Sequence, residues 1–387
     1  MNERENGKRR GVWAAFAAVA VLLLTVGLAA CGGGGGGIEG GGEEESQQVK
    51  LEGKPSGHLT ISNWPLYIDE GTVPAFEKAT GVSVKYVEDI NSNEEFFNKL
   101  QPLLARGESG GRSIFVLADY MVAKMHKLGY LMEFDKSGMP EFEKNLSASL
   151  RNPPFDPNRD YTAPWQSGMT GLIVNTEAAP DARSMCALFD PKYKGKVDVL
   201  NEVREAVPLT MKCEGKDPNE ASEADWMKAI EKLKAAAESG QIRRFTGNDY
   251  ARDLTSGDAV VVMGWSGDAV QLQEDNPNLE WRMPTEGCML WSEDMVIPVG
   301  APNPTAAEAW INFVYKPEIQ ANIAEYVNYV TPVEGVKPIL AKRSPELANN
   351  QLIFPSESFT KKCSPTPTIE GEEEQNVIRA FNAVLNG

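Results

Sequence analysis

Short apolar runs alternate along the chain with segments whose apolar residues recur at helical spacing. The first apolar runs, which we expect to form strands, are Leu59–Asn63, Val82–Val87 and Ile114–Leu117. The helices expected between and after them are Glu70–Ala79, Asn93–Arg106 with Asn93 as cap, and Asp119 to about Leu128 with Asp119 as cap. This alternation predicts a mostly parallel sheet with helices on both faces.

A second α/β block follows a loop-like stretch at residues 153–164. Its expected strands are Gly168–Asn175, Val197–Leu200, Ala259–Met263 and Met295–Val299. Its expected helices are one from about Val203, the amphipathic Glu223–Glu238, two in Thr305–Val327 broken near Pro317, and Glu373–Val384. Residues 332–359 carry many loop signals. Two α/β blocks suggest two lobes, and the cleft between lobes is a favoured place for a ligand.

The N-terminus has the pattern of a targeting segment. Basic Lys8–Arg10 precedes the apolar run Val12–Ala30, and Leu28–Cys31 resembles the lipobox of bacterial lipoproteins. We therefore expect residues 1–30 to be a lipoprotein signal peptide, with Cys31 lipidated as the mature N-terminus. The alternative is an uncleaved membrane anchor, because the apolar run is about long enough to span a bilayer.

Residues 31–57 are rich in Gly and Glu, and we interpret them as a flexible tether. With the lipobox, this predicts an exported protein, held by lipid on the outer face of the cytoplasmic membrane or otherwise periplasmic. The formal charge of -17 argues against a nucleic-acid partner and favours cationic ligands, although an acidic surface also serves solubility alone.

The chain offers little for catalysis or metal binding. Its only histidines are His58 and His126, so a Ser-His-Asp or Cys-His arrangement has little to draw on. No Cys-x-x-Cys spacing and no phosphate-binding G-x-x-x-x-G-K-[ST] loop occurs. We expect no metal, no cofactor and no enzymatic activity.

Four cysteines remain besides Cys31, and an exported protein can form disulfides. They are Cys186, Cys213, Cys288 and Cys363. Four cysteines allow three pairings, of which we favour Cys186–Cys213 and Cys288–Cys363.

Aromatic and acidic residues recur where the expected strands end or begin. Within Gly257–Leu272, Trp265 and Asp268 follow the strand Ala259–Met263. The other positions of this kind are Trp64 and Tyr67, Asp119 and Tyr120, Glu202 and Glu205, and Trp291 with Glu293 and Asp294. Each alone is typical of a core Trp or a helix cap. Together they indicate a site for a cation on an apolar body, because aromatic faces attract cations.

Several longer stretches carry a family resemblance. They are SNWPLYID, FEKATGVSVKY, DYMVAKMHKLGYL, FDPNRDYTAPWQSGMTGLIVN, LFDPKYKGKV, GDAVVVMGWSGDAV, EGCMLWSEDMVIP and NYVTP. In this order, from about residue 59 to residue 335, the chain resembles the spermidine/putrescine (polyamine) substrate-binding proteins of bacterial ABC transporters.

The resemblance implies an α/β periplasmic-binding-protein fold (type II-like) of two lobes, each a mostly parallel sheet flanked by helices, with a hinge between. The hinge segments would lie near Gln166–Thr170 and Trp291–Met295, with a third near Thr331. Lobe 1 would comprise residues 58–168 plus about 292–332. Lobe 2 would comprise residues 169–291 plus about 333–387.

The resemblance also implies a set of ligand-binding residues. The aromatic residues that would line the cleft are Trp64, Tyr67, Tyr120, Trp265, Trp291 and Tyr329. The carboxylates that would hold ammonium groups are Glu202, Glu205, Asp268 and Glu293, and Asp119 falls where family members carry a polar or acidic group. Two departures from the family pattern stand out. Pro65-Leu66 lies where some spermidine binders have an acid. Glu293-Asp294 stands where relatives more commonly have Asp followed by Ser or Asn, so either Glu293 or Asp294 could contact the ligand. Cys288 occupies a Gly-rich position of relatives, which fits an added disulfide to Cys363.

The expected function is that of a monomeric receptor that captures putrescine or spermidine and delivers it to an ABC permease. One alternative is the same fold bound to another solute, such as another amine, an iron complex or a small anion. A second is an exported hydrolase with a carboxylate pair such as Glu202 and Glu205. A third is a structural or signalling lipoprotein whose cleft binds nothing.

Overall fold

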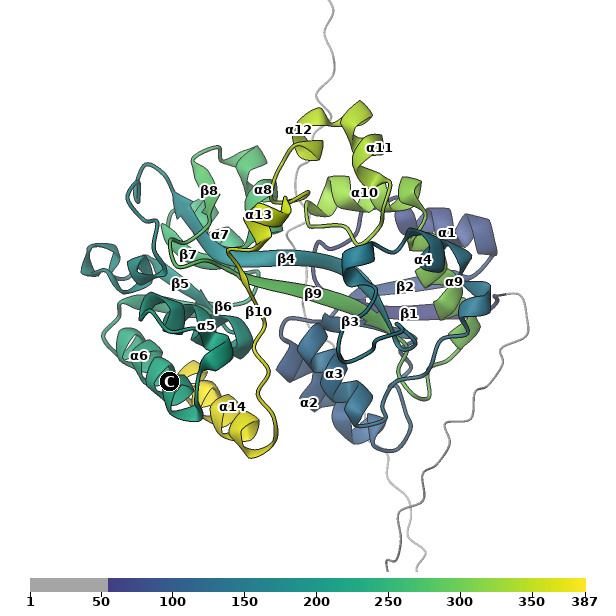
Figure 1. Cartoon of the computed structure of the whole chain (residues 1–387), viewed down its shortest axis with the longest axis horizontal. Coiled ribbons are helices and arrows are strands. Elements are labelled where there is room, and N and C mark those ends of the chain that lie inside the picture. Colours follow the sequence, from purple (N-terminus) through teal and green to yellow (C-terminus); the bar gives the residue numbers. More distant parts are fainter. Residues whose placement is uncertain (1–54) are drawn as a thin grey trace, which may run out of the picture. The chain divides into compact units, whose positions relative to one another are not determined.

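The computed structural model describes residues 55–387 (Figure 1). The expected signal peptide, the tether up to residue 54 and the lipidation candidate Cys31 lie outside the described residues. Within the described part of the chain, no helix has the length and apolar character needed to cross a bilayer.

The described strands form one mixed sheet. Along the sheet, the order is β2 (Ser83–Glu88), β1 (His58–Asn63), β3 (Ile114–Ala118), β9 (Met289–Val296), β4 (Thr162–Asn175), β7 (Val261–Trp265), β5 (Val197–Leu200) and β6 (Ile242–Thr246). Two further strands are β10 (Ser364–Pro365), which pairs with β9, and β8 (Leu279–Arg282), which pairs with β4. Pairing is parallel within β2-β1-β3 and within β7-β5-β6, as the βα alternation predicts.

The helices divide into groups around these two parallel sets of strands (Figure 1). The first half holds β1–β3 with α1 (Thr72–Thr80), α2 (Asn93–Leu104), α3 (Asp119–Lys127), α4 (Pro140–Asn145) and α9 (Pro304–Val314). The second half holds β5–β8 with α5 (Val203–Cys213), α6 (Glu223–Glu238), α7 (Tyr250–Ser256), α8 (Ser266–Asp275) and α14 (Gly371–Leu385), which packs against α6. The remaining helices are α10 (Pro317–Val327), α11 (Val336–Arg343), α12 (Pro345–Ala348) and α13 (Glu357–Thr360).

Two long antiparallel strands, β4 and β9, join the halves. β9 pairs with β3 at Met295, and β4 pairs with β7 at Thr170. Ser167 of β4 also forms an antiparallel bridge with Val330. The three segments expected to cross between the lobes therefore lie side by side here.

Several boundaries differ from the sequence-based prediction. β9 begins at Met289 and not at Met295, because its mixed polar and apolar sequence hides the strand pattern. β4 begins at Thr162, inside the stretch that looked like a loop. Ser92, not Asn93, caps α2 by accepting a hydrogen bond from the Glu95 amide. Residues 332–359 contain α11, α12 and part of α13, and the strand β6 was not anticipated.

The structure contains two disulfides, Cys186–Cys213 and Cys288–Cys363, which are the favoured pairings. The first joins the segment before β5 to the end of α5. The second joins the start of β9 to the chain just before β10, so the C-terminal segment is tied covalently to a strand that crosses between the halves.

Candidate functional site

The halves line a cavity that is partly open to solvent, with about 580 Å³ of empty space including that open part. The predicted site residues that line it are Trp64, Tyr67, Tyr120, Glu205, Trp265, Asp268, Trp291, Glu293 and Tyr329. Residues that the sequence reasoning did not assign to the site also line it: Pro65, Leu66, Asn93, Ala118, Arg204, Asn248 and Thr366. The cavity lies where strands of both halves end, which is where the strand-end pattern placed these residues.

Aromatic rings from both halves contribute to the cavity wall. The ring centroids of Trp64 and Trp265 lie 6.2 Å apart in an edge-to-face arrangement, which brings one residue of each half together. Tyr329 packs edge-on against Tyr67 at 5.2 Å and against Trp291 at 5.6 Å. All but Trp291 are buried, so these rings present mainly apolar faces to the cavity.

Two glycines make room for this wall. A Cβ atom on Gly168 would collide with the Trp291 ring, and one on Gly267 would collide with the Tyr329 ring. Gly267 lies in the first turn of α8, directly before Asp268. Glycine is therefore required at both positions because backbone and ring approach closely there, and not because of a strained turn.

Asp268 is held by three donors. Its carboxylate accepts hydrogen bonds from the Tyr329 hydroxyl (2.5 Å), the Tyr250 hydroxyl (2.7 Å) and the Asn248 side-chain amide (2.8 Å). Burial raises the pKa of Asp268, and the three hydrogen bonds oppose that rise. The side chain makes no cap contact with its own helix, whose N-cap is Trp265. Asp268 therefore belongs to the cavity and does not cap α8.

Glu205 is the second cavity carboxylate. The indole nitrogen of Trp265 donates a hydrogen bond of 2.9 Å to Glu205 Oε2, which also accepts from the Thr170 hydroxyl. The indole nitrogen of Trp291 donates to that hydroxyl at 2.9 Å. Burial raises the pKa of Glu205 to about 8, which favours the protonated carboxyl at neutral pH in the absence of a cation.

Glu293 and Asp294 point to opposite faces of β9, because side chains alternate along a strand. Glu293 lines the cavity, and burial raises its pKa well above the usual range. Asp294 forms a buried ion pair with Arg159 at 2.7 Å. Of the two candidates, Glu293 is therefore the one placed to meet a ligand, and Asp294 has a structural partner.

Two predicted site residues do not line the cavity. Glu202 is buried behind it, where it accepts hydrogen bonds from the Asn93 backbone amide (3.2 Å), the Asn93 side chain (3.4 Å) and the Tyr120 hydroxyl (3.3 Å). Burial raises its pKa to about 7. Asp119 lies near Asp294 and Arg159, and burial raises its pKa well above the usual range. Glu202 thus joins the halves through Asn93 and Tyr120.

Some of the residues that sequence reasoning missed follow a strand that it also missed. Asn248 and Tyr250 follow β6, whose two central arginines break the apolar run that would have marked a strand. The same strand-end rule would have found both, had β6 been recognised. Arg204 and Thr366 carry no comparable signal, since their place depends on how the C-terminal segment returns to the cavity.

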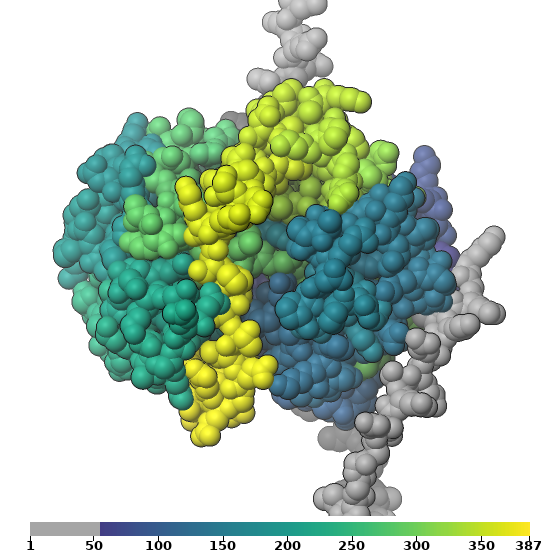
Figure 2. Space-filling model, in the orientation of Figure 1, coloured from purple at the N-terminus to yellow at the C-terminus, as the bar shows by residue number. Residues whose placement is uncertain are grey.

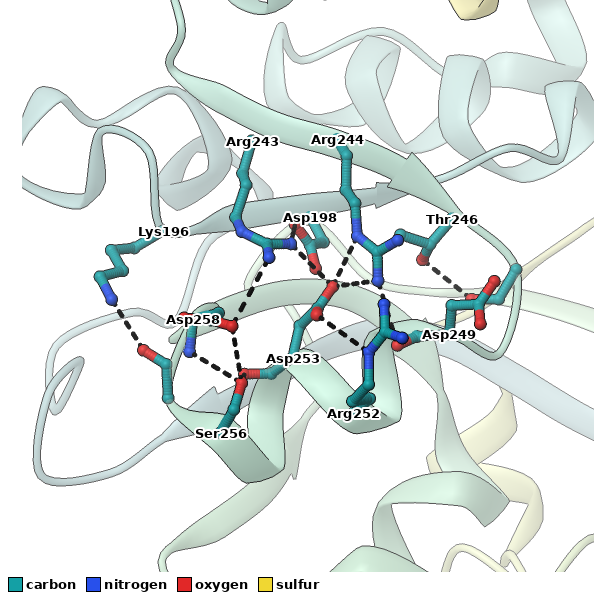
Figure 3. Close-up of polar contacts among 12 residues, drawn as sticks. Lys196, Asp198, Arg243, Arg244, Thr246, Asp249, Arg252, Asp253, Ser256 and Asp258 are labelled. Atoms are coloured by element: carbon teal, nitrogen blue, oxygen red, sulfur yellow. Dashed lines mark hydrogen bonds and ion pairs between the residues drawn. The ribbon is translucent and has the colours of Figure 1, made fainter. Parts of the chain in front are cut away.

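A charged cluster supports the loop that carries Asn248 and Tyr250 (Figure 3). Asp253 of α7 is 2% exposed and pairs with Arg243 of β6 at 2.8 Å and also with Arg244. Arg243 reaches Asp198 of β5 at 3.6 Å. These contacts fasten α7 to β5 and to the edge strand β6, so the donors at its start are held against Asp268.

The side chains around the cavity suit an amine. Among the described residues, no group of three or more His, Cys, Asp or Glu side chains is arranged to hold a metal. The cavity instead combines aromatic faces with separated carboxylates, which can accept charge-assisted hydrogen bonds from ammonium groups while the rings contact methylenes.

Comparisons with known proteins agree with this geometry. A family model described as bacterial extracellular solute-binding protein matches residues 72–355. The spermidine/putrescine-binding periplasmic protein of Escherichia coli strain K12 is 29% identical over 329 residues, which cover 84% of this chain and 88% of that protein. Its namesake from Salmonella typhimurium strain LT2 is 30% identical over 306 residues, which cover 79% of this chain and 85% of that protein.

Solved structures show the same fold. A putative spermidine/putrescine ABC transporter protein from Listeria monocytogenes superposes with a TM-score of 0.77 at 29% identity. The matched region covers 84% of this chain and 98% of that one. The architecture described above is therefore a periplasmic-binding-protein fold.

Proposed function

Because the chain belongs to the family of bacterial extracellular solute-binding proteins, we propose that it captures a polyamine in the cavity between its halves and delivers it to an ABC importer. Proteins of this family are receptors and not enzymes. The relatives named above bind spermidine and putrescine according to their names, and those diamine and triamine chains are the ligands we propose here.

The observation that carries the proposal is the joint placement of Glu205, Asp268 and Glu293 on a cavity walled by aromatic rings. A polyamine is an apolar chain with ammonium groups at fixed intervals. Rings such as Trp64 and Trp265 can contact its methylenes and attract its charges. Burying those charges without carboxylate partners would be very costly, so the three acids are required for such a ligand.

The same arrangement disfavours an anion and a carboxylate-pair hydrolase. Arg204 lines the cavity, but it already pairs with Glu374 and with two backbone carbonyl groups. Of the suspected hydrolase pair, Glu205 lines the cavity, whereas Glu202 is engaged with Asn93 and Tyr120 behind it. The cavity is therefore lined by three acidic side chains and by an arginine that is already paired.

We further propose the lobe division and the anchoring expected from sequence. The two halves would act as lobes, with β4, β9 and the segment near Thr331 as the hinge between them. The protein is an extracytoplasmic binding protein, and a lipid on Cys31 would hold the monomeric receptor near its permease.

Calorimetric titration of the full chain in mild detergent with putrescine, spermidine and spermine tests the proposal. We expect saturable one-to-one binding of at least one of them, with micromolar or tighter affinity. Absence of binding to all three, together with binding of an amino acid or an anion, would leave a solute receptor but overturn the polyamine assignment. Labelling with radioactive palmitate, with and without Cys31→Ser, tests the anchor separately.

A further inference from the structure

The C-terminal segment, which runs from Cys363 to the end of α14 at Leu385, lies between the two halves. Figure 2 shows it in yellow as a narrow band along the boundary between them. It is fixed at its start by the Cys288–Cys363 disulfide and by the pairing of β10 with β9. Thr366 lines the cavity, and the segment ends in α14, which packs against α6 of the second half. The segment therefore belongs to the second half while lying against the first.

Arg204 holds this segment in place. Its guanidinium donates hydrogen bonds to the carbonyl oxygens of Pro367 (3.0 Å) and Ile369 (3.2 Å), and it pairs with Glu374 at 2.8 Å. The guanidinium is almost fully buried and lies 4.8 Å from the centre of the Tyr120 ring. Arg204 belongs to α5, so these contacts to the C-terminal segment stay within the second half.

Glu374 also reaches the first half. The oxygen that pairs with Arg204, Oε1, lies 3.4 Å from Lys124 Nζ on α3. The Glu374 side chain is 14% exposed and that of Lys124 is 27% exposed, so the pair is partly shielded from water. One turn earlier, Glu370 pairs with Lys127 of α3 at 2.8 Å, but both of those side chains are well exposed. A single carboxylate oxygen thus contacts a cation from each half.

Opening of the cleft would affect the two pairs differently. Glu374 and Arg204 would move together, because α14 packs on α6 and Arg204 donates hydrogen bonds to Pro367 and Ile369, just before α14. Lys124 would move away with α3. Glu94 of α2 stays beside Lys124 in the first half, and its Oε1 atom is buried without a hydrogen-bond partner. The Lys124–Glu374 pair can therefore exist only when the halves are closed.

We propose that Glu374 is a positioning residue that latches the closed receptor: it anchors to Arg204 in the second half and captures Lys124 of the first. This inference rests on the proposed function. Glu374 does not line the cavity, so it would act on the lifetime of the closed form and not through contact with the ligand. Release of the solute then requires the Lys124–Glu374 pair to break.

Stopped-flow tryptophan fluorescence of the full chain with putrescine and spermidine tests the latch. We expect Glu374→Gln and Lys124→Gln each to raise the dissociation rate by about 2- to 10-fold, as for a partly exposed ion pair, with little change in the association rate. The double variant should dissociate no faster than the faster single variant, because both remove the same pair. Lys124→Arg, which keeps the charge, should restore most of the slow rate.

Glu372→Gln is the matched control. Glu372 lies in the same first turn of α14, is exposed, and forms no ion pair among the described residues. It removes the same charge and should leave the dissociation rate unchanged. The latch is overturned if the effects of the two single variants multiply in the double variant. It is also overturned if Lys124→Gln has no effect, since Glu374 would then act only within the second half.

A distance measurement separates failure of the latch from failure of the proposed ligand. Spin labels on Lys99→Cys of α2 and Lys234→Cys of α6, both exposed positions, report the separation of the halves. In ligand-free protein, Glu374→Gln should shift the distance distribution towards longer values, and Glu372→Gln should not. This result tests the latch even if no polyamine binds, and identical distributions in all three proteins would overturn it.

Discussion

The Tyr329 hydroxyl donates a hydrogen bond of 2.5 Å to Asp268 Oδ1, although the two residues lie 61 positions apart. Tyr329 adjoins the segment that bridges to β4, and Asp268 opens α8 of the second half. The bond therefore ties a cavity carboxylate to the region that joins the halves. The Tyr329 ring packs in turn on Tyr67 and Trp291. The Asp268 carboxylate and the aromatic wall of the cavity are therefore held in place by the same residue.

Replacement of Asp268 by asparagine should abolish most of the affinity for a polyamine. The neutral amide cannot balance an ammonium charge. Its NH₂ group would also be turned towards one of the three groups that now donate hydrogen bonds to Asp268, namely Tyr329, Tyr250 or Asn248. We expect a loss of about 2–5 kcal/mol of binding free energy in calorimetric titration. Asp275→Asn, which alters an exposed aspartate of the same helix, is the control and should bind normally. Equal affinity of the Asp268→Asn and wild-type proteins would exclude this carboxylate from the site.

Polyamine binding should release protons near neutral pH. Burial raises the pKa of Glu205 to about 8 and that of Glu202 to about 7, so in the ligand-free closed form both carry protons below these values. An ammonium group favours the ionised carboxylate and lowers its pKa, whereas the amine itself, like lysine, stays charged until about pH 10. Affinity should therefore rise with pH between about 6 and 8.

Calorimetry in two buffers of different ionisation enthalpy measures this proton release. At pH 7 the observed binding enthalpies in phosphate and in Tris should differ in proportion to the protons released. In Glu205→Gln the difference should shrink, because its main source is removed. Identical enthalpies in the two buffers for the wild-type protein would contradict the prediction.

A methyl group at Gly267 should damage the cavity more than the fold. The added Cβ would collide with the Tyr329 ring, which can yield only by leaving its hydrogen bond to Asp268. We expect Gly267→Ala to weaken binding at least about tenfold and to cost about 1–3 kcal/mol of stability, as overpacking does. Gly138→Ala is the control, because nothing lies within 4 Å of its Cβ position. Titration and thermal unfolding of both variants provide the measurement.

The sequence alone was informative where a strand is a plain apolar run. β3, β5 and β7 were recognised that way, and the residues at their ends, such as Tyr120, Glu205 and Asp268, do line the cavity. β6 and the first part of β9 escaped because charged or polar residues occupy them. In these strands the tertiary pairing, which sequence does not display, decides the conformation.

The sequence also could not predict the direction of some side chains or the contacts between residues far apart in the chain. Glu293 and Asp294 could not be told apart until the register of β9 placed one on each face. Glu202 was predicted to contact a ligand, and sequence could not show that its carboxylate accepts hydrogen bonds from Asn93 and Tyr120 of the other half. Arg204 gave no signal, since its partners at Pro367, Ile369 and Glu374 lie more than 160 positions away.

The cluster around Asp253 should be a strong determinant of stability, in contrast to its exposed neighbour Asp258. Asp253 is 2% exposed and faces Arg243 and Arg244. Burial acts to raise the pKa of its carboxyl, but the two arginines more than offset this effect and the pKa is lowered. Asp253→Asn leaves the arginines without their shared carboxylate and should cost about 3–5 kcal/mol in urea unfolding at pH 7. Asp258→Asn, at a side chain 56% exposed, should cost about 0–1 kcal/mol. Similar losses in both variants would show that α7 is held by its apolar contacts and not by this charge cluster.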